Sequence, residues 1–204
     1  MCPEIGILFR GDMVRAILAG QKWQTRRAIR FGVAPAPATP PSWSDGTRIK
    51  QTIAKPCRFS VGARLWVRET WRPSWNESDG DGAWITYAAD EACRWQDAPG
   101  GMALEDWFDR EAVHASAATP RWRPSIYMPR WASRITLTVI ALRSERLTMI
   151  SEEDVQAEGF PHAGLGSTPT DYCRAYRAMH KLPADADPPV WVVTFTSKFN
   201  PEHT

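Results

Sequence analysis

A short stretch near the N-terminus combines residue types that can carry acid–base and nucleophilic chemistry. Lys22 and Thr25 lie within it, and the stretch reads Gly20-Gln21-Lys22-Trp23-Gln24-Thr25-Arg26-Arg27. A partly desolvated lysine has a lowered pKa and can accept a proton. A nearby threonine hydroxyl can then act as a nucleophile or hold a water molecule. A plainer interpretation stays open, in which Lys22 is a cation that interacts with the C-terminus of the preceding helix.

A helix and a strand are needed to position these side chains. Apolar residues at helical spacing predict an amphipathic helix over residues 12–19, and Gly20 follows directly after it. Glycine allows a sharp change of chain direction, so residues 24–29 are expected to resume as a strand. Because side chains alternate along a strand, Thr25 and Arg27 should point to the same side.

Two carboxylates at the ends of expected elements are candidates for the acid group. Glu69 belongs to a strand expected over residues 64–71, and Glu158 ends a short helix expected over residues 151–158, with Gly159 as its stop. Side chains at element ends can reach into a shared cavity mouth. Simpler interpretations stay open, namely a solvated strand edge for Glu69 and a surface helix end for Glu158.

The remaining pattern contains more strands than helices. Further strands are expected over residues 5–9, 83–88, 134–147 and 190–195, and a further helix over residues 170–181. Two segments lack this pattern and are expected to be insertions, at about 32–58 (rich in proline) and at about 90–124 (with a short helix over residues 104–113). Few helices connect the strands, which favours an α+β fold, a mostly antiparallel β-barrel decorated with short helices. The 204 residues suit a single domain over residues 1–204.

Composition excludes several classes of protein. A net charge of +2 and a pI near 8.4 argue against a strongly cationic nucleic-acid coat. The four cysteines are scattered without ligand spacing, so neither a zinc site nor a disulfide framework is expected, and a cytoplasmic location is favoured. The N-terminal residues lack the layout of a signal peptide, and no apolar run approaches a membrane span. The four histidines show no partner in the sequence and are expected at the surface.

The motif Gly20-x-Lys22-x-x-Thr25-x-Arg27 resembles the G-x-K-x-x-[ET]-x-R signature of the ASCH superfamily. Those domains are small β-barrels related to the PUA fold, which binds RNA. Residues 62–67, 150–154 and 191–195 extend the resemblance, which covers about two-thirds of the chain. The longer stretches Trp-Val-Arg-Glu-Thr-Trp at 66–71 and Pro-Arg-Trp-Ala-Ser-Arg-Ile at 129–135 are similar to ASCH proteins common in phages and prophages.

Threonine at the fourth signature position is similar to small bacterial amidohydrolases that cleave N4-acetylcytidine with a lysine, a threonine and a glutamate. The resemblance implies that Lys22, Thr25 and Glu158 are catalytic, with Glu69 as the competitor for the acid role. It implies hydrolysis of N4-acylated cytosine or cytidine without a metal or other cofactor. The present chain is about twice as long as those enzymes, so its extra segments could reshape the pocket.

Several other residues are candidates for substrate binding. Arg27 or a backbone N–H could stabilise the oxyanion of the attacked carbonyl. Aromatic side chains that could stack on the base are Trp66, Trp71 and Trp131. Polar side chains that could contact the base or a phosphate are Arg68, Glu69 and Arg134. The expected partner is a small modified nucleoside or nucleobase, with RNA as a second option. Two alternatives are a PUA-like binding module for RNA or a modified nucleotide, without catalysis, and a phage accessory protein with a vestigial cleft.

Overall fold

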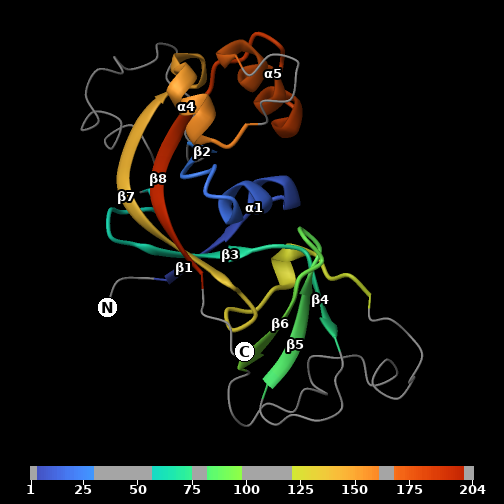
Figure 1. The fold of residues 1–204 in the computed structure, drawn as a ribbon. Helices are drawn as coiled ribbons and strands as arrows, with labels where there is room; N and C mark the ends of the chain where they lie inside the picture. The colour runs from blue at the N-terminus through green and yellow to red at the C-terminus, as the bar shows by residue number, and fades with distance from the viewer. Residues whose placement is uncertain (1–3, 30–56, 75–81, 98–120, 161–167, 200–204) are drawn as a thin grey trace, which may run out of the picture.

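The computed structural model describes residues 4–29, 57–74, 82–97, 121–160 and 168–199, which form two sheets and three α-helices (Figure 1). The larger sheet holds five strands, in spatial order β1 (Glu4–Leu8), β3 (Arg64–Arg68), β7 (Ile135–Arg146), β8 (Pro189–Phe199) and β2 (Gln24–Ala28). The smaller sheet holds three, in the order β4 (Trp71–Ser74), β5 (Gly82–Tyr87) and β6 (Cys93–Asp97). The expected α+β class is confirmed.

The larger sheet is mostly antiparallel but does not close into a barrel in the described part of the chain. β1 pairs with β3 in parallel, whereas β3, β7, β8 and β2 pair antiparallel in turn. β1 and β2 are therefore the two edges of an open sheet. The alternating sequence pattern indicates strands, but it contains no signal for whether the outer two strands meet, which is why a barrel was the wrong expectation for these residues.

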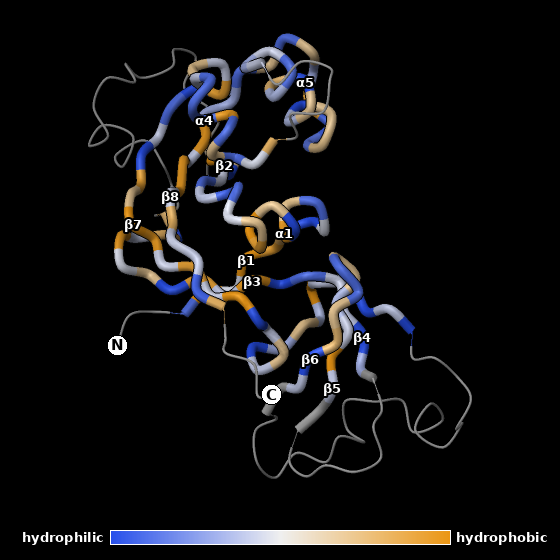
Figure 2. Tube along the Cα trace, viewed as in Figure 1, coloured by the Kyte–Doolittle hydropathy of each residue, from blue (hydrophilic) through white to orange (hydrophobic). Residues whose placement is uncertain are grey.

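The first helix covers one face of the larger sheet. α1 (Gly11–Leu18) buries Val14 and Ile17 against Leu65, Leu137 and Phe195 of the strands. Figure 2 shows the apolar residues gathered where α1 lies beside β1 and β3. This contact fixes the end of α1, and with it the turn that leads into β2.

The strand expected over residues 64–71 is divided between the two sheets. β3 ends at Arg68 and β4 begins at Trp71, so Glu69 lies in the short link between them. β6 occupies part of the 90–124 segment, where little strand signal was found. The helix expected over residues 104–113 and most of the proline-rich segment lie outside the described residues.

Two further helices lie at the end of the molecule opposite the three-stranded sheet (Figure 1). α4 (Glu152–Ala157), the helix expected over residues 151–158, is capped by Ser151, whose hydroxyl accepts from the Asp154 backbone N–H at 3.2 Å. α5 (Pro169–His180) is capped in the same way by Thr168. Short 3₁₀ turns are η2 (Ser125–Tyr127) and η3 (Leu147–Met149). Within the described ranges, the helices are too short or too polar to cross a bilayer.

Candidate functional site

Lys22 lies in the turn between α1 and β2 and is almost completely buried. Gly20 has a positive φ of 69°, so the chain reverses there as expected, and the Lys22 backbone N–H donates to Ala16 O at 3.1 Å. The Lys22 amine donates to three acceptors: Gln24 O at 2.8 Å, Glu158 O at 2.8 Å and Glu158 Oε2 at 2.7 Å. Only 2% of the residue is exposed. Three acceptors around one amine suit an ammonium group, which has three donors.

Glu158 reaches Lys22 because the end of α4 forms a backbone bridge with the turn. Lys22 and Glu158 form an isolated β-bridge, and Trp23 N donates to Ala157 O at 3.0 Å. Gly159 follows with a φ of 64°, and a Cβ there would lie 2.8 Å from the Lys22 Cβ. A glycine is therefore needed for this close approach.

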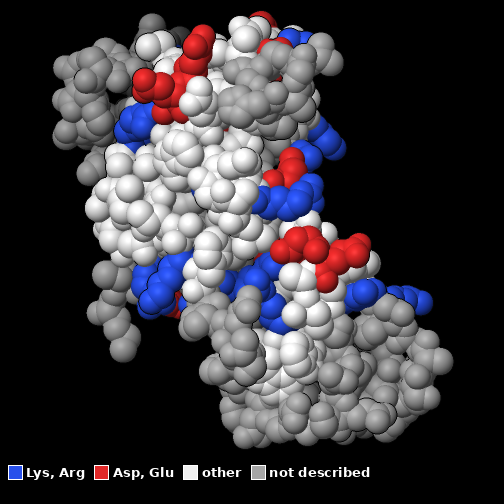
Figure 3. Space-filling model, in the orientation of Figure 1, with Lys and Arg blue, Asp and Glu red and all other residues white. Residues whose placement is uncertain are grey.

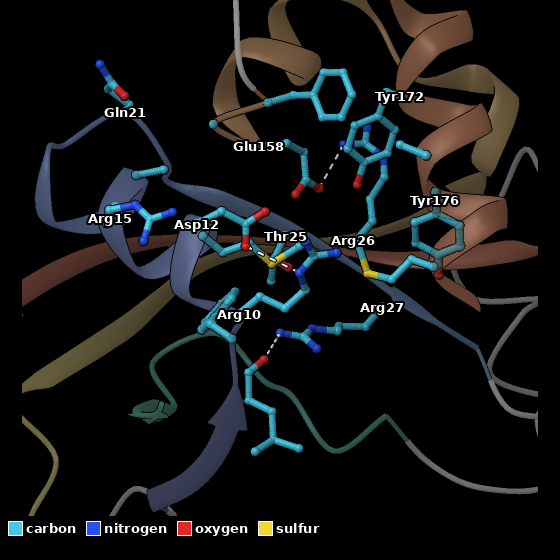
Figure 4. A pocket seen from close by; sticks show the side chains of 18 of the residues that line it. Arg10, Asp12, Arg15, Gln21, Thr25, Arg26, Arg27, Glu158, Tyr172 and Tyr176 are labelled. Atoms are coloured by element: carbon cyan, nitrogen blue, oxygen red, sulfur yellow. Dashed lines mark hydrogen bonds and ion pairs between the residues drawn. The ribbon is translucent and has the colours of Figure 1, made fainter. Parts of the chain in front are cut away.

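Thr25 and Glu158 both line a cavity of about 830 Å³ between α1, β2 and α5 (Figure 4). Thr25 is buried, yet its hydroxyl makes no hydrogen bond within the described part of the chain. Lys22 lies behind the cavity wall, with its amine 5.8 Å from the centre of the Phe9 ring that forms part of that wall. Glu158 is thus the member of the ion pair that faces the cavity.

Burial and ion pairing act in opposite directions on Lys22. Desolvation is the larger effect and lowers the pKa of the Lys22 amine, while the charge of Glu158 and the hydrogen bond to it raise that pKa. The net direction is downward, which eases loss of a proton from the amine. The direction agrees with the lowered pKa expected from the sequence, whereas the three hydrogen bonds of the amine favour its charged form.

Arg26, for which the sequence suggested no role, holds the other oxygen of Glu158. Its Nη1 donates to Glu158 Oε1 at 3.2 Å, and its Nη2 donates to Glu145 at 2.6 Å and to Asp154 at 2.7 Å. The side chain of Arg26 is fully buried. Five residues therefore form one network, which we call the Lys22 cluster: Lys22, Arg26, Glu145, Asp154 and Glu158. This network fixes the orientation of the Glu158 carboxylate.

Aromatic side chains form much of the remaining wall, and sequence reasoning missed them. The rings that line the cavity belong to Phe9, Phe160, Tyr172, Tyr176 and His180. Tyr172, Tyr176 and His180 are spaced four residues apart on α5, so they share one helix face. That spacing was visible in the sequence and could have indicated the stripe. His180 is exposed, as expected, but stands at the cavity edge with its ring 4.3 Å from that of Tyr176.

Glu69 and Arg134 pair with each other and not with the Lys22 cluster. Arg134 Nε and Nη2 donate to the two oxygens of Glu69, each at 2.9 Å, and Arg134 also contacts Asp90. We call these three residues the Arg134 cluster. Burial, the largest influence, raises the pKa of Glu69, and the contacts with Arg134 offset part of that rise. Neither Glu69 nor Arg134 lines the cavity.

The other predicted substrate contacts also lie apart from the cavity wall. Trp71 is completely buried in the core of the smaller sheet, with Ile85 and Tyr87, and Trp131 packs against this core. The ring of Trp66 is covered by the Arg68 guanidinium at 5.1 Å from its centre. Of the predicted set of binding residues, the structure brings only Arg27 to the cavity. The tryptophans are occupied by packing, which the sequence does not distinguish from stacking on a ligand.

Metal ligands do not gather in the described residues, where no group of three or more His, Cys, Asp or Glu side chains could hold an ion. Charged side chains are distributed over the surface, and the face in Figure 3 carries acidic and basic groups side by side. Among the described residues, the chemistry of the site therefore comes from the buried Lys22–Glu158 ion pair, the Thr25 hydroxyl and the aromatic walls.

Comparisons with known proteins add little to this description. No family model and no curated protein matches the chain. Among solved structures, the chain is similar to a protein from Enterococcus faecalis V583 that is assigned to the DUF984 family model, with 9% identity and a TM-score of 0.41. The alignment covers 97% of this chain and 77% of that chain. A likeness at this level carries no argument about function.

Proposed function

We propose that the protein is an ASCH-like amidohydrolase that removes the acyl group from the exocyclic amine of N4-acylated cytosine or cytidine. One observation carries the proposal: the buried Lys22–Glu158 pair, joined at 2.7 Å, presents its carboxylate to the same cavity that the buried Thr25 lines. The contact between Lys22 and Glu158, which lie 136 positions apart in the chain, therefore supports the triad that the motif resemblance implies. A proton acceptor and a hydroxyl on the wall of one cavity are the two groups that nucleophilic catalysis requires.

In this proposal the Thr25 oxygen attacks the acyl carbon of the substrate. The hydroxyl proton passes to the Lys22–Glu158 pair, whose Glu158 oxygen faces the cavity. The bond between the acyl carbon and the exocyclic nitrogen then breaks, and the nitrogen takes its electron pair and the proton from the pair. Water hydrolyses the resulting Thr25 ester, which releases a carboxylate and restores the hydroxyl. Because Lys22 has no direct contact with the cavity, its role is to share the proton with Glu158 and to hold that carboxylate.

The cavity has the size and lining that a modified nucleoside needs. About 830 Å³ lies within the usual range for small-molecule sites, roughly 300–1,000 Å³. The rings of Phe160 and Tyr172 lie 5.6 Å apart at this wall and offer a surface for the base. Stacking on such a ring is worth about 1–3 kcal/mol per base.

Turnover of N4-acetylcytidine, followed by its ultraviolet absorbance and by chromatography of the cytidine formed, tests the proposal. We expect multiple turnovers by the wild-type protein and a loss of about 10²–10⁴-fold in kcat for Thr25→Ala, with partial activity for Thr25→Ser. Thr70→Ala, which alters a threonine in the link between β3 and β4, is the matched control and should keep wild-type activity. Binding of the nucleoside without any product would instead favour the alternative, a PUA-like binding module.

A further inference from the structure

Arg26 and Arg27 are neighbours on β2 but have opposite electrostatic surroundings. Arg26 donates to three carboxylates. Arg27 forms no ion pair with a described carboxylate; its Nη2 donates to Leu8 O at 2.7 Å, and its guanidinium lies 4.9 Å from the centre of the Phe9 ring. The Nε of Arg27 is buried without any acceptor in the described part of the chain. Arg27 therefore brings an unsatisfied donor and an unneutralised charge to the cavity that it lines.

Arg27 forms no ion pair with a described carboxylate, although the charge of Glu158 acts on it from a distance. The ionised network behind the cavity is balanced, with three cations against three carboxylates: Lys22, Arg26 and Arg143 against Glu145, Asp154 and Glu158. Arg27 is additional to this balance. Burial, the largest influence, lowers the pKa of the Arg27 guanidinium, and the charge of Glu158 offsets part of that fall.

A second polar group without a partner lines the same cavity. The Tyr176 residue is only 4% exposed, and its hydroxyl has no hydrogen-bond partner among the described residues. Burial raises the pKa of this hydroxyl to about 12, so it remains a neutral donor at physiological pH. Arg27, Tyr176 and His180 line one cavity, where the Tyr176 and His180 rings lie 4.3 Å apart and Figure 4 shows Arg27 and Tyr176 at the same wall. Buried donors without acceptors are costly, so a bound ligand that accepts from them would gain affinity.

We propose that Arg27 and Tyr176 form a subsite for a phosphate monoester, so that the substrate of this cavity is an N4-acylated cytidine 5′-nucleotide. Phosphate oxygens accept from both donor types, and a guanidinium is well suited to them because it combines charge with several N–H groups. The assignment rests on the proposed function for the identity of the base. It gives Arg27 a role in recognition in place of stabilising the oxyanion.

Binding measurements on the Thr25→Ala variant, by isothermal titration, separate phosphate recognition from turnover. The probes are N4-acetylcytidine, its 5′-monophosphate, and a single-stranded RNA that carries one N4-acetylcytidine. We expect the monophosphate to bind at least about tenfold more tightly than the nucleoside, and its affinity to fall with added salt. We also expect the RNA to bind no better than the monophosphate. Equal affinity for nucleoside and monophosphate would overturn the subsite, and tighter binding of the RNA would overturn the assignment to a mononucleotide.

Variants then test the two donors. Adding Arg27→Gln to the Thr25→Ala variant should reduce affinity for the monophosphate about tenfold or more, to the level of the nucleoside. Affinity for the nucleoside should stay within about twofold of that of Thr25→Ala alone. Tyr176→Phe should reduce only monophosphate affinity, by a smaller factor. Arg174→Gln, an exposed arginine paired with Asp171 on the same helix, removes the same charge and should change neither affinity. Arg27→Lys keeps the charge, so it should retain a preference for the monophosphate even if the glutamine variant does not fold. Equal losses for both ligands in the Arg27 variants would contradict the proposal.

Turnover distinguishes this inference from the function on which it rests. Preference for the monophosphate without hydrolysis would support the phosphate subsite and refute the amidohydrolase. Hydrolysis of nucleoside and monophosphate with equal kcat/KM would support the amidohydrolase and refute the subsite. If Arg27→Gln lowers kcat equally for both substrates, Arg27 acts on the reacting carbonyl and the subsite is refuted.

Discussion

The molecule contains two buried clusters of ion pairs that look alike by composition but differ in what surrounds them. In the Lys22 cluster the Glu158 side chain is 3% exposed, and in the Arg134 cluster the Glu69 side chain is 2% exposed. Glu158 faces a cavity that Thr25 also lines, whereas both oxygens of Glu69 are held by Arg134 and neither residue of that pair lines the cavity. The contrast teaches that a buried carboxylate indicates a reactive site only where a cavity and an unsatisfied group accompany it.

The closed cluster has the features of a structural support. Arg134 lies 4.0 Å from the centre of the Tyr87 ring and joins Glu69, at the link between the sheets, to Asp90 after β5. It thereby ties the five-stranded sheet to the three-stranded sheet. The open cluster connects β2, β7 and α4 but leaves one carboxylate edge at the cavity.

Replacing Glu158 or Glu69 by glutamine should reveal the largest difference between the clusters, a difference in catalytic activity. We expect Glu158→Gln to lower kcat for N4-acylcytidine by about 10²–10⁴-fold, because the proton acceptor at the cavity is lost. Glu69→Gln should stay within a few-fold of wild-type activity in the same assay. Circular dichroism confirms that each variant is folded before rates are compared. Equal loss of activity in both variants would remove the distinction between the clusters.

Breaking the closed cluster should instead reduce stability. Arg134→Met leaves Glu69 buried without its cation, which typically costs about 3–5 kcal/mol in the free energy of unfolding. Urea denaturation measures this cost. Arg143→Gln, which removes a half-exposed arginine at the surface side of the Lys22 cluster, should cost less than about 1 kcal/mol. A small effect for Arg134→Met would show that the pair does not join the sheets.

Lowering the pH should change the stability contributed by Glu69 and by Asp154 in opposite directions. This is the smallest of the three effects expected for the clusters. Burial raises the pKa of Glu69 above 4.5. The stability that Glu69 contributes is therefore present below pH 4.5 and is lost as the pH rises through the pKa of the folded state. For Asp154, burial is outweighed by hydrogen bonds from Arg143 and Arg26, which lower its pKa below 3.8. Its contribution is present above 3.8 and is lost as the pH falls through the folded-state pKa.

Unfolding free energies measured by urea denaturation across this pH range check both signs. Glu69→Gln should abolish the loss of stability on raising the pH above 4.5, and Asp154→Asn should abolish the loss on lowering it below 3.8. Identical pH profiles for the two variants would contradict the assignment of opposite shifts.

Local features of the fold could be predicted from the sequence because they follow from short-range rules. The turn at Gly20, the cap at Ser151 and the stop at Gly159 each depend on residues only a few positions away. The division of the expected 64–71 strand could not be predicted in this way. The link at which the strand divides holds Glu69, whose partner Arg134 is 65 positions away in the chain.

The candidate site was predictable only in part, for the same reason. The Lys22–Glu158 contact came from a motif resemblance, since no local pattern connects those residues. The aromatic stripe of Tyr172 and Tyr176 was visible as a four-residue spacing, but nothing in the sequence shows that the two rings line a cavity in addition to packing in the core. Trp71 is the opposite case, a residue that the sequence favoured for stacking on a base. Its ring is fully buried in the smaller sheet and cannot stack on a ligand there.

A single-turnover experiment with excess protein over N4-acetylcytidine tests the central claim most directly. Rapid quenching followed by mass spectrometry measures the cytidine released and the acyl group carried by the peptide that contains Thr25. The account predicts one equivalent of cytidine with the acetyl group transiently on Thr25, and neither signal in Thr25→Ala. Release of cytidine that is unaffected by Thr25→Ala, or no release at all, would contradict it.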